Sequence, residues 1–257
     1  MRIGVMGAMP QEIAATVALL DECCTQQHGG RDYTTGTHQG HRVVCVHARI
    51  GKVAAASAAV ELIVRFGIER LLFTGLAGAL SADLQVGDVV IADGLIQHDI
   101  DASPLFPPLE VPLTGMSRFT ATPEIASALA RAARRSLKEV GDDMRAAQVD
   151  QAADTQRAFA PVRGDIATGD QFVASGAARD RICSRVPGAV CVEMEGAAVA
   201  QVCHEYGIPF GVMRVISDRA DGSAAADFFT ALAGTAAALS ARVIDRVLTE
   251  WANEPDR

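Results

Sequence analysis

Two clusters of acidic side chains follow strongly apolar segments of this 257-residue chain. Glu193 comes directly after an apolar run at 190–192, with Glu195 two residues further on, and Asp218 and Asp221 follow another apolar run at 210–216 after Ser217. Carboxylates held together in a pocket are candidates for acid–base chemistry, because burial and mutual repulsion shift their pKa values. The alternative interpretation is that acidic residues cap helices that follow the two strands. The presence of both clusters favours the chemical interpretation.

The two apolar runs have the composition of buried strands, so each acidic cluster is expected at the carboxyl end of a strand. In open α/β sheets, the ligand crevice lies outside the carboxyl ends of the strands. The sequence therefore predicts that both clusters face one pocket.

Strands and helices alternate along the rest of the chain. Apolar runs bounded by turn residues predict strands at 3–6, 32–37, 42–48, 71–73, 86–96, 166–168, 190–192 and 210–216. Helical spacing and helix start and stop signals predict helices at 10–20, 54–66, 123–138 and 225–251. The proline-rich stretch 98–117 is expected to be a long loop, and 141–161 either a surface helix or a mobile insert. This order predicts one α/β domain with a mixed, largely parallel sheet.

Composition excludes several classes of protein. The formal net charge is −8 and no block of basic residues is present, which argues against a nucleic-acid surface but not against a small nucleoside. No apolar run reaches the roughly 18 residues that span a bilayer, and the first residues do not resemble a signal peptide. The six cysteines lack zinc-site spacing and are expected to be buried and reduced. We therefore expect a cytoplasmic protein with neither nucleic-acid nor membrane partners.

Six loops, each at the end of an expected strand, carry the residues that are most informative about function. These loops are Gly7-Ala8-Met9-Pro10-Gln11-Glu12, Ile50-Gly51-Lys52-Val53, Thr74-Gly75-Leu76-Ala77-Gly78, Gly169-Asp170-Gln171-Phe172, Val192-Glu193-Met194-Glu195 and Ser217-Asp218. In this order they closely resemble the methylthioadenosine/S-adenosylhomocysteine nucleosidases of the nucleoside phosphorylase superfamily. The resemblance covers nearly the whole chain and fails only around 104–163. It implies a single three-layer domain over 1–257, with a variable insert around 104–163.

The resemblance also implies an activity, the hydrolysis of the bond between adenine and a 5′-thio-substituted ribose. Asp218 matches the general acid that protonates the departing adenine, and an apolar pocket would raise the pKa of such an acid. Glu12 matches the general base that orients the attacking water. Glu195 matches the carboxylate that binds the ribose hydroxyls, with Glu193 and Met194 beside it at ribose positions.

Further matches concern substrate binding. Phe172 corresponds to the ring that stacks on adenine, the Val173 backbone to the strand edge that reads the base, and Ser217 to a residue that steadies the acid. The residues that match an apolar subsite for the 5′-alkylthio group are Met9, Ile50 and Phe228. Ala77 and Gly78 belong to a turn in which glycine permits close approach of the backbone to a ligand.

The resemblance implies a homodimer in which the segment 98–110 lies near the active site of the partner. His98, Asp99 and Asp101 could be mistaken for metal ligands, but no metal or cofactor is expected. Lys52 follows a glycine, yet the phosphate-loop pattern is absent, so it is interpreted as a surface or helix-start lysine.

Two positions depart from the family pattern. Leu76 stands where many relatives have serine, and Arg49 stands where a small residue is common. An arginine near the sugar could bind phosphate, so a phosphate-dependent purine nucleoside phosphorylase is the alternative activity. The carboxylate of Glu12, at the place where phosphate would bind, favours water instead. A nucleosidase that prefers another 5′-substituted adenosine, and a catalytically silent nucleoside-binding protein, are the remaining alternatives.

Overall fold

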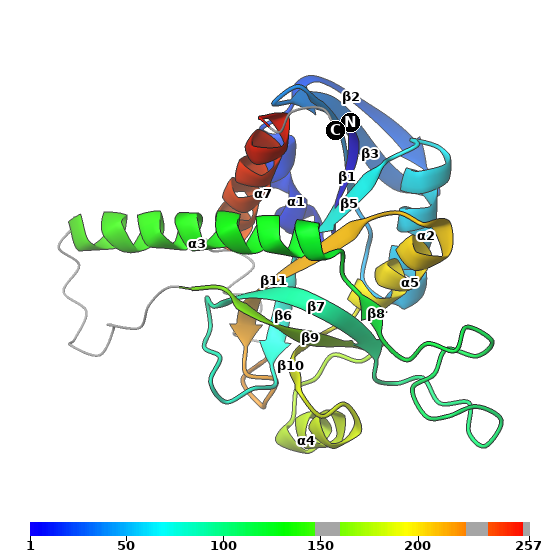
Figure 1. Ribbon diagram of the computed structural model, residues 1–257. Coiled ribbons are helices and arrows are strands. Elements are labelled where there is room, and N and C mark those ends of the chain that lie inside the picture. The colour runs from blue at the N-terminus through cyan, green and yellow to red at the C-terminus, as the bar shows by residue number, and fades with distance from the viewer. Residues whose placement is uncertain (147–159, 225–235, 254–257) are drawn as a thin grey trace.

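The computed structural model describes residues 1–146, 160–224 and 236–253, which form a β-sheet covered by helices (Figure 1). The strands are β1 (Arg2–Gly7), β2 (Asp21–His28), β3 (Arg31–His38), β4 (His41–His47), β5 (Arg70–Phe73), β6 (Leu76–Ala79), β7 (Val89–Gln97), β8 (Phe119–Thr120), β9 (Val162–Thr168), β10 (Ala189–Glu193) and β11 (Phe210–Asp218). The helices are α1 (Pro10–Val17), α2 (Lys52–Val64), α3 (Pro123–Ala146), α4 (Gly176–Arg185), α5 (Gly196–Tyr206) and α7 (Ala236–Ala252).

All these strands belong to one sheet, in the order β2-β3-β4-β1-β5-β11-β6-β10-β9-β7-β8. The strands from β4 to β6 run parallel, so the loops after their carboxyl ends lie along one edge. Strands covered on both faces consist of continuous apolar runs, and every residue of β11 is buried. Strands β3 and β4 form a hairpin, with the two strands antiparallel.

Strand β11 takes part in two regions of the sheet. Its residues 210–212 pair with β5, 213–215 with β7, and 215–218 with β6. Strand β7 also pairs with β9, β9 with β10, and β10 with β6. These five strands therefore close into a ring.

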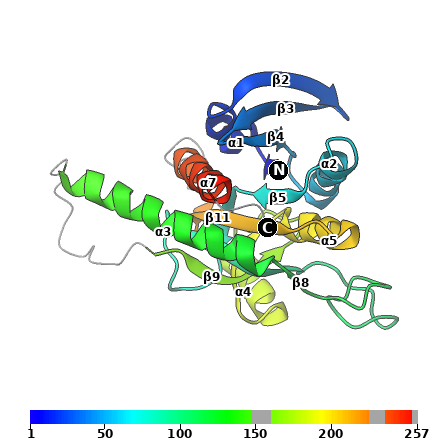
Figure 2. The same ribbon diagram turned by 45° about the horizontal axis from the view of Figure 1, so that its top comes forward.

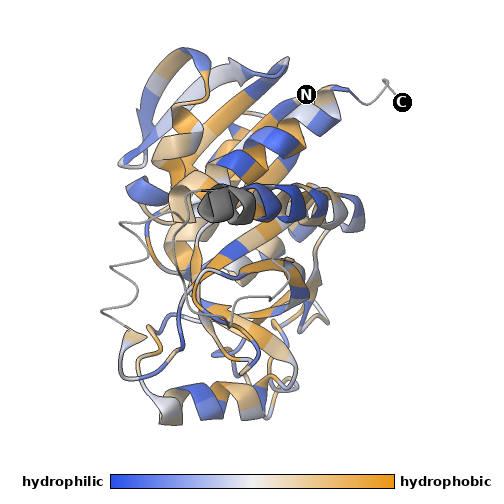
Figure 3. Ribbon diagram, turned by 90° about the vertical axis from the view of Figure 1, so that its left-hand side faces the viewer, coloured by the Kyte–Doolittle hydropathy of each residue, from blue (hydrophilic) through white to orange (hydrophobic). Residues whose placement is uncertain are grey.

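Helices cover both faces of the sheet and give the molecule three layers (Figure 2). On one face, α2 and α5 pack against each other through a core that includes Ala55, Ala58 and Leu62. On the other face, α1, α3 and α7 pack through a second core that includes Leu129 and Ile244. Figure 3 shows orange strands between helices that carry blue residues on their outer faces. The expected α/β class is confirmed.

Strands β2, β6 and β8 and helices α4 and α5 differ from the sequence-based expectation. Strand β8 has only two residues, too few to show a pattern. Strand β2 was not expected, because its residues are polar and almost all exposed. Its position at the edge of the sheet, paired only with β3, explains that composition. Strand β6 was expected to be a glycine-containing turn, but it pairs with both β10 and β11. Its four residues are all buried, as a central strand requires.

Some boundaries also differ. Helix α1 ends at Val17, before the expected limit, and α3 continues beyond Lys138 to Ala146. The rest of the uncertain stretch 141–161 is largely outside the described residues, as is the expected start of the last helix at 225–235. Residues 98–118 form the expected long loop between β7 and β8. None of the helices in the described ranges combines the length and apolarity needed to cross a membrane.

Candidate active site

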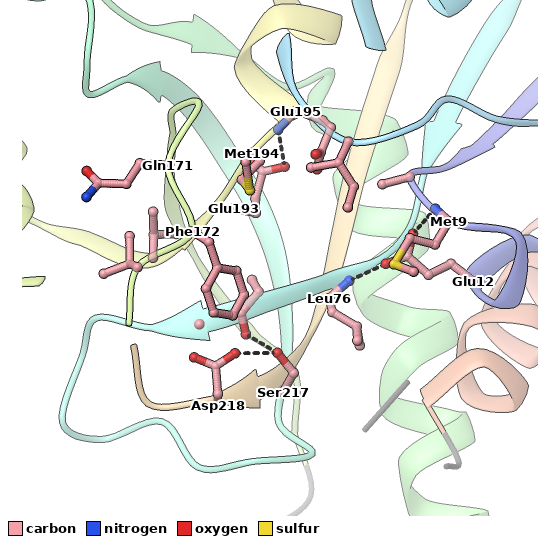
Figure 4. Close-up of a pocket in the computed structure, with 16 residues that line it drawn as sticks. Met9, Glu12, Leu76, Gln171, Phe172, Glu193, Met194, Glu195, Ser217 and Asp218 are labelled. Carbon is pink, nitrogen blue, oxygen red and sulfur yellow. Dashed lines mark hydrogen bonds between the residues drawn. The ribbon is translucent and has the colours of Figure 1, made fainter. Parts of the chain in front are cut away.

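A cavity of about 340 Å³ lies beside the end of β11 and across β6 (Figure 4). Cavities of this size hold small-molecule ligands. Every expected site residue that the structure describes lines this cavity: Met9, Glu12, Ile50, Ala77, Gly78, Phe172, Val173, Glu193, Met194, Glu195, Ser217 and Asp218. Phe228 lies outside the described residues. Ala8, Gln171 and Val192 also line the cavity and were not expected there.

Strand β6 explains how the two acidic clusters reach one cavity. Strand β11 runs parallel to β6 and places Asp218 opposite Gly78. Strand β10 runs antiparallel to β6 and places Val192 opposite the same Gly78. The clusters therefore meet across β6, as expected. Both strands carry their acidic residues at the carboxyl end, as expected, but β10 runs antiparallel to β6 and therefore opposite to β11.

Glu12 lies in the first turn of α1, which Pro10 begins directly after the loop from β1. Its Oε2 accepts a hydrogen bond from the Met9 N–H at 2.8 Å, and its Oε1 accepts one from the Leu76 N–H at 3.1 Å. Burial raises the pKa of Glu12, while Arg214 and the backbone N–H groups lower it. Both carboxyl oxygens are therefore held in fixed positions at the wall of the cavity.

Leu76 occupies the position where the resemblance led us to expect serine. Its side chain is buried and lines the cavity, while its backbone N–H binds Glu12. A backbone N–H does not depend on the side chain that the residue carries. The substitution therefore removes a hydroxyl from the cavity wall but leaves this hydrogen bond to Glu12 in place.

Glu193 is anchored by Arg214, a residue that sequence reasoning missed. The Arg214 Nη2 donates to Glu193 Oε2 at 2.6 Å, and the N–H groups of Glu195 and Gly196 donate to the same oxygen. The Thr168 hydroxyl donates to the other oxygen of Glu193. Glu193 therefore joins β9, β11 and the start of α5. The available signal for Arg214 was an arginine in the middle of an otherwise apolar strand.

Glu195 precedes α5 and reaches the loop after β4, where its Oε1 accepts a hydrogen bond from the Gly51 N–H at 2.9 Å. Burial and the neighbouring Glu193 raise the pKa of Glu195 to about 8, whereas Arg214 and the Gly51 N–H lower it. Near neutral pH this carboxyl therefore holds a proton much of the time. A cationic group bound beside it would favour the ionised form.

Asp218 ends β11 and is buried on the side of the cavity away from Glu195 (Figure 4). Its Oδ2 lies 2.7 Å from the Ser217 hydroxyl, and its Oδ1 accepts a hydrogen bond from the Ala220 N–H at 2.8 Å. A methyl group on Gly78 would come within 2.8 Å of Asp218 Oδ1. Glycine at position 78 therefore leaves room for the carboxyl group.

The loop after β9 carries Phe172, which is 44% exposed at the cavity, and Val173, which is buried. Hydrogen bonds connect this loop to the start of α2. The Lys52 N–H donates to Asp170 Oδ1 at 2.8 Å, and the Asp170 N–H donates to Asp99 Oδ2 at 2.9 Å. Lys52 Nζ also donates to Asp99 Oδ1 at 2.6 Å. Lys52 thus begins α2, and its ammonium group is held in an ion pair.

The residues that could be mistaken for metal ligands have other contacts. Asp99 pairs with Lys52, and Asp101 accepts a hydrogen bond from Arg185 Nη2 at 3.0 Å. The ring of His98 packs so closely on Gly169 that a methyl group there would lie 2.3 Å from His98 Nε2. In the part of the chain that the structure describes, no group of three or more His, Cys, Asp or Glu residues could hold a metal ion.

Comparison with known proteins finds relatives that match most of the chain. A model of the phosphorylase superfamily matches residues 2–249. A 5′-methylthioadenosine/S-adenosylhomocysteine nucleosidase from Shewanella sp. (strain MR-7) is 32% identical over 228 residues, which cover 89% of this chain and 88% of that protein.

Two solved structures extend this similarity. The nucleosidase of the same name from S. pneumoniae, solved with a transition-state inhibitor, has a TM-score of 0.82 at 35% identity and covers 97% of this chain and 99% of that one. Futalosine hydrolase from Helicobacter pylori has a TM-score of 0.81 at 30% identity and covers 97% of both chains.

The three-layer fold and the carboxylate-lined cavity thus define an enzyme of the phosphorylase superfamily. Within that superfamily, the chain belongs to the 5′-methylthioadenosine/S-adenosylhomocysteine nucleosidase family. The family resemblance found in the sequence is therefore confirmed. The roles of the individual residues in the cavity remain predictions.

Proposed function

We propose that the protein hydrolyses the N-glycosidic bond of 5′-methylthioadenosine and S-adenosylhomocysteine, releasing adenine and the 5-thio-substituted ribose. The observation that carries this proposal is the gathering of three carboxyl groups, Glu12, Glu195 and Asp218, around one cavity. They come from α1, from the residue before α5 and from the end of β11, so only the folded chain brings them together.

Asp218 acts as the general acid in this proposal. Adenine is a poor leaving group as an anion, so a proton must reach N7 of its five-membered ring as the glycosidic bond breaks. The Ser217 hydroxyl and the Ala220 N–H hold the Asp218 carboxyl in one orientation. Phe172 lines the same cavity and offers a ring for the base to stack on, with the Val173 backbone at its edge.

Glu12 acts as the general base. Water is a weak nucleophile, and a carboxylate beside it accepts its proton as the water attacks the anomeric carbon. Burial brings the pKa of Glu12 above the ordinary glutamate value, which makes it a better proton acceptor. An acid or a base of this kind contributes about 10²–10⁴-fold to the rate.

Glu195 binds the ribose hydroxyls, and its ionised form stabilises the positive charge that develops on the sugar. Glu193 supports it, because the Glu193 carboxylate accepts a hydrogen bond from the Glu195 N–H and is itself fixed by Arg214. Met194 lines the ribose side of the cavity, while Met9 and Ile50, with Phe228, form the 5′-alkylthio subsite in this proposal.

The charges around the cavity favour hydrolysis over phosphorolysis. Four carboxyl residues line it, and none of the described lining residues is lysine, arginine or histidine. Arg214 lies behind the cavity wall and is paired with Glu193. A phosphate dianion would meet the Glu12 carboxylate here without a lining cation to offset the repulsion, whereas water carries no charge.

Adenine release from 5′-methylthioadenosine, followed with and without phosphate, tests this function. We expect the same rate in both buffers and free methylthioribose as the second product. Strict dependence on phosphate, with a sugar 1-phosphate as product, would show that the enzyme is a phosphorylase. A wild-type protein that binds the nucleoside without turnover would support the silent binding protein instead.

Futalosine hydrolysis is the second candidate, because a futalosine hydrolase matches this chain with nearly the same TM-score as the nucleosidase. A panel of 5′-methylthioadenosine, S-adenosylhomocysteine, 5′-deoxyadenosine and futalosine ranks the substrates. A kcat/KM for futalosine well above those of the three adenosines would favour the second candidate.

We further propose that the protein is a homodimer in which the segment 98–110 lies beside the active site of the partner. Leu105 and Leu113 are 84% and 90% exposed on the loop that contains this segment, and Ile50 is 52% exposed at the cavity. Burial of these side chains at an interface would stabilise a dimer. Light scattering after gel filtration should give twice the chain mass, and Leu105→Asp should shift it towards the monomer.

A cytoplasmic location completes the proposal. All six cysteines are free thiols, but the expectation that they are buried is wrong for Cys23 and Cys24, which lie exposed on the edge strand β2. Exposed free thiols suit a reducing compartment. Cell fractionation with an antibody against the protein tests this location.

A further inference from the structure

A second hollow, an open groove of about 450 Å³, adjoins the catalytic cavity. Ile50 lines both the cavity and the groove. The two hollows also meet along the loop after β9, because Asp170 lines the groove and the next residue, Gln171, lines the cavity. A substrate whose 5′ substituent passes Ile50 would therefore continue into this groove.

Three cationic side chains line the groove, and two of them are already occupied. Arg31 is buried, and its guanidinium donates to the carbonyl oxygens of Gly29, Ala48 and Ala54. The ammonium of Lys52 donates to Gln97 and Asp99. The hydrogen-bonding groups of Arg31 and Lys52 are therefore used within the protein rather than offered to a ligand.

Arg49 is the third cation and is exposed. Among the described residues, its one hydrogen bond runs from Nη2 to the Gly30 carbonyl, so the other guanidinium N–H groups can reach a ligand. Its backbone φ is +69°, a conformation that glycine adopts more easily than arginine. An arginine at this position is therefore not explained by the local backbone.

The charges of the two hollows differ in sign where a ligand would cross between them. The catalytic cavity is lined by four carboxyl residues and would repel an anionic group. The groove beyond Ile50 offers the exposed guanidinium of Arg49. A nucleoside whose 5′ substituent ends in a carboxylate would place its sugar among carboxylates and its anionic end beside a cation.

We propose that this groove binds the far end of the 5′ substituent and that Arg49 recognises a carboxylate there. The proposal rests on the proposed function, because it assigns the 5′ end of the same substrates. S-adenosylhomocysteine ends in an amino acid and so carries such a carboxylate, whereas 5′-methylthioadenosine ends in a methyl group. Asp170, on the same groove, offers an opposite charge to the ammonium group of the amino acid.

The test compares three nucleosides with wild-type enzyme and the variant Arg49→Met. The nucleosides are 5′-methylthioadenosine, S-adenosylhomocysteine and a 5′-(carboxypropylthio) analogue that has the carboxylate without the ammonium. Arg49 lies away from the bond that breaks, so its contact contributes equally to the ground state and the transition state and affects KM rather than kcat. We expect Arg49→Met to raise KM about five- to tenfold for both carboxylates, as for a partly exposed charge-assisted pair, and to leave 5′-methylthioadenosine unchanged.

Two further variants control for structure and for general charge. Arg49→Lys keeps a cation and should restore most of the affinity for the carboxylate-ended nucleosides. Arg65→Met removes an exposed arginine at the other end of α2 and should change no KM. An increase in salt concentration should weaken the binding of the two carboxylate-ended nucleosides to wild-type enzyme but not to Arg49→Met.

Equal effects of Arg49→Met on all three nucleosides, or no effect on any, would overturn the proposal. A rise in KM for S-adenosylhomocysteine but not for the 5′-(carboxypropylthio) analogue would show that the carboxylate alone is not recognised, and it would also overturn the proposal. Calorimetric Kd values for the same ligands keep this test independent of turnover. Wild-type protein that releases no adenine would refute the proposed function, while its Kd values would still decide the role of Arg49.

Discussion

Arg214 and Glu193 form a salt bridge that is almost sealed from solvent, with 2.6 Å between Nη2 and Oε2 and exposed side-chain fractions of 1% and 2%. The guanidinium also lies 4.1 Å from the centre of the Phe73 ring. Its positive charge lowers the pKa of both Glu12 and Glu195, against the raising effect of burial. One buried cation therefore helps three neighbouring carboxyl groups to share a small region of the protein.

Removal of Arg214 should destabilise the fold strongly. Arg214→Met leaves Glu193 buried without a counterion, and the loss of one partner of a buried pair costs about 3–5 kcal/mol. The double variant Arg214→Met/Glu193→Gln removes the stranded charge, so it should regain part of that stability. Urea unfolding of wild type, the single variant and the double variant measures the difference. Equal free energies of unfolding for the two variants would argue against this interpretation of the pair.

Glu195 should make stability depend on pH in a direction opposite to that of a carboxylate whose pKa is lowered by folding. Its folded pKa of about 8 lies above the ordinary value of 4.5, so the folded protein binds more protons than the unfolded chain between these values. The resulting stabilisation is complete below the unfolded pKa and is lost as the pH rises through the folded pKa. Glu195→Gln removes this loss. The difference in Tm between the variant and wild type should therefore increase in favour of the variant as the pH is raised from about 5 to about 9.

Thermal unfolding across this pH range measures the effect. Glu205→Gln, an exposed change at the other end of α5, is the matched control for the loss of a glutamate and should not reproduce the rise seen for Glu195→Gln. A relative Tm for Glu195→Gln that falls with pH would mean that the folded pKa is depressed instead.

Gly75 provides the space between the proposed base and the buried cation. A methyl group at this position would lie 2.9 Å from Glu12 Oε1 and 3.3 Å from Arg214 Nη1. Gly75→Ala should therefore displace the Glu12 carboxylate and lower kcat about 10²-fold, the effect expected of a misplacement near 1 Å. Gly176→Ala is the control, because a methyl group there meets nothing within 4 Å. Steady-state kinetics of both variants measures the effect. A wild-type kcat for Gly75→Ala would contradict the role of Glu12 as the general base.

The fold was predictable wherever burial produced an apolar run. Strand β11 was recognised because it is buried along its whole length. Strand β2 was not, because its side chains are exposed and only its pairing with β3 makes it a strand. Strand β6 has the sequence Leu-Ala-Gly-Ala, and a short run with glycine fits a turn as well as it fits a strand.

The site residues followed from the family resemblance, but the way they are held did not. Arg214 is separated from Glu193 along the chain, and only the pairing of β6 with both β10 and β11 makes them neighbours. The antiparallel direction of β10 could not be read from its apolar residues, because strand direction depends on tertiary pairing. The same limit applies to the groove beside Arg49, which brings together residues from α2 and from the loops after β4 and β9.

The most direct test of the three-carboxylate site is the variant Glu12→Gln, assayed with 5′-methylthioadenosine in phosphate-free buffer. Glutamine keeps the size of the side chain and an oxygen that can accept from Leu76, but it cannot take a proton from water. We expect kcat to fall by about 10²–10⁴-fold, while the calorimetric Kd for the nucleoside stays within a few fold of wild type. Turnover by Glu12→Gln near the wild-type rate would show that the attacking water needs no carboxylate from α1.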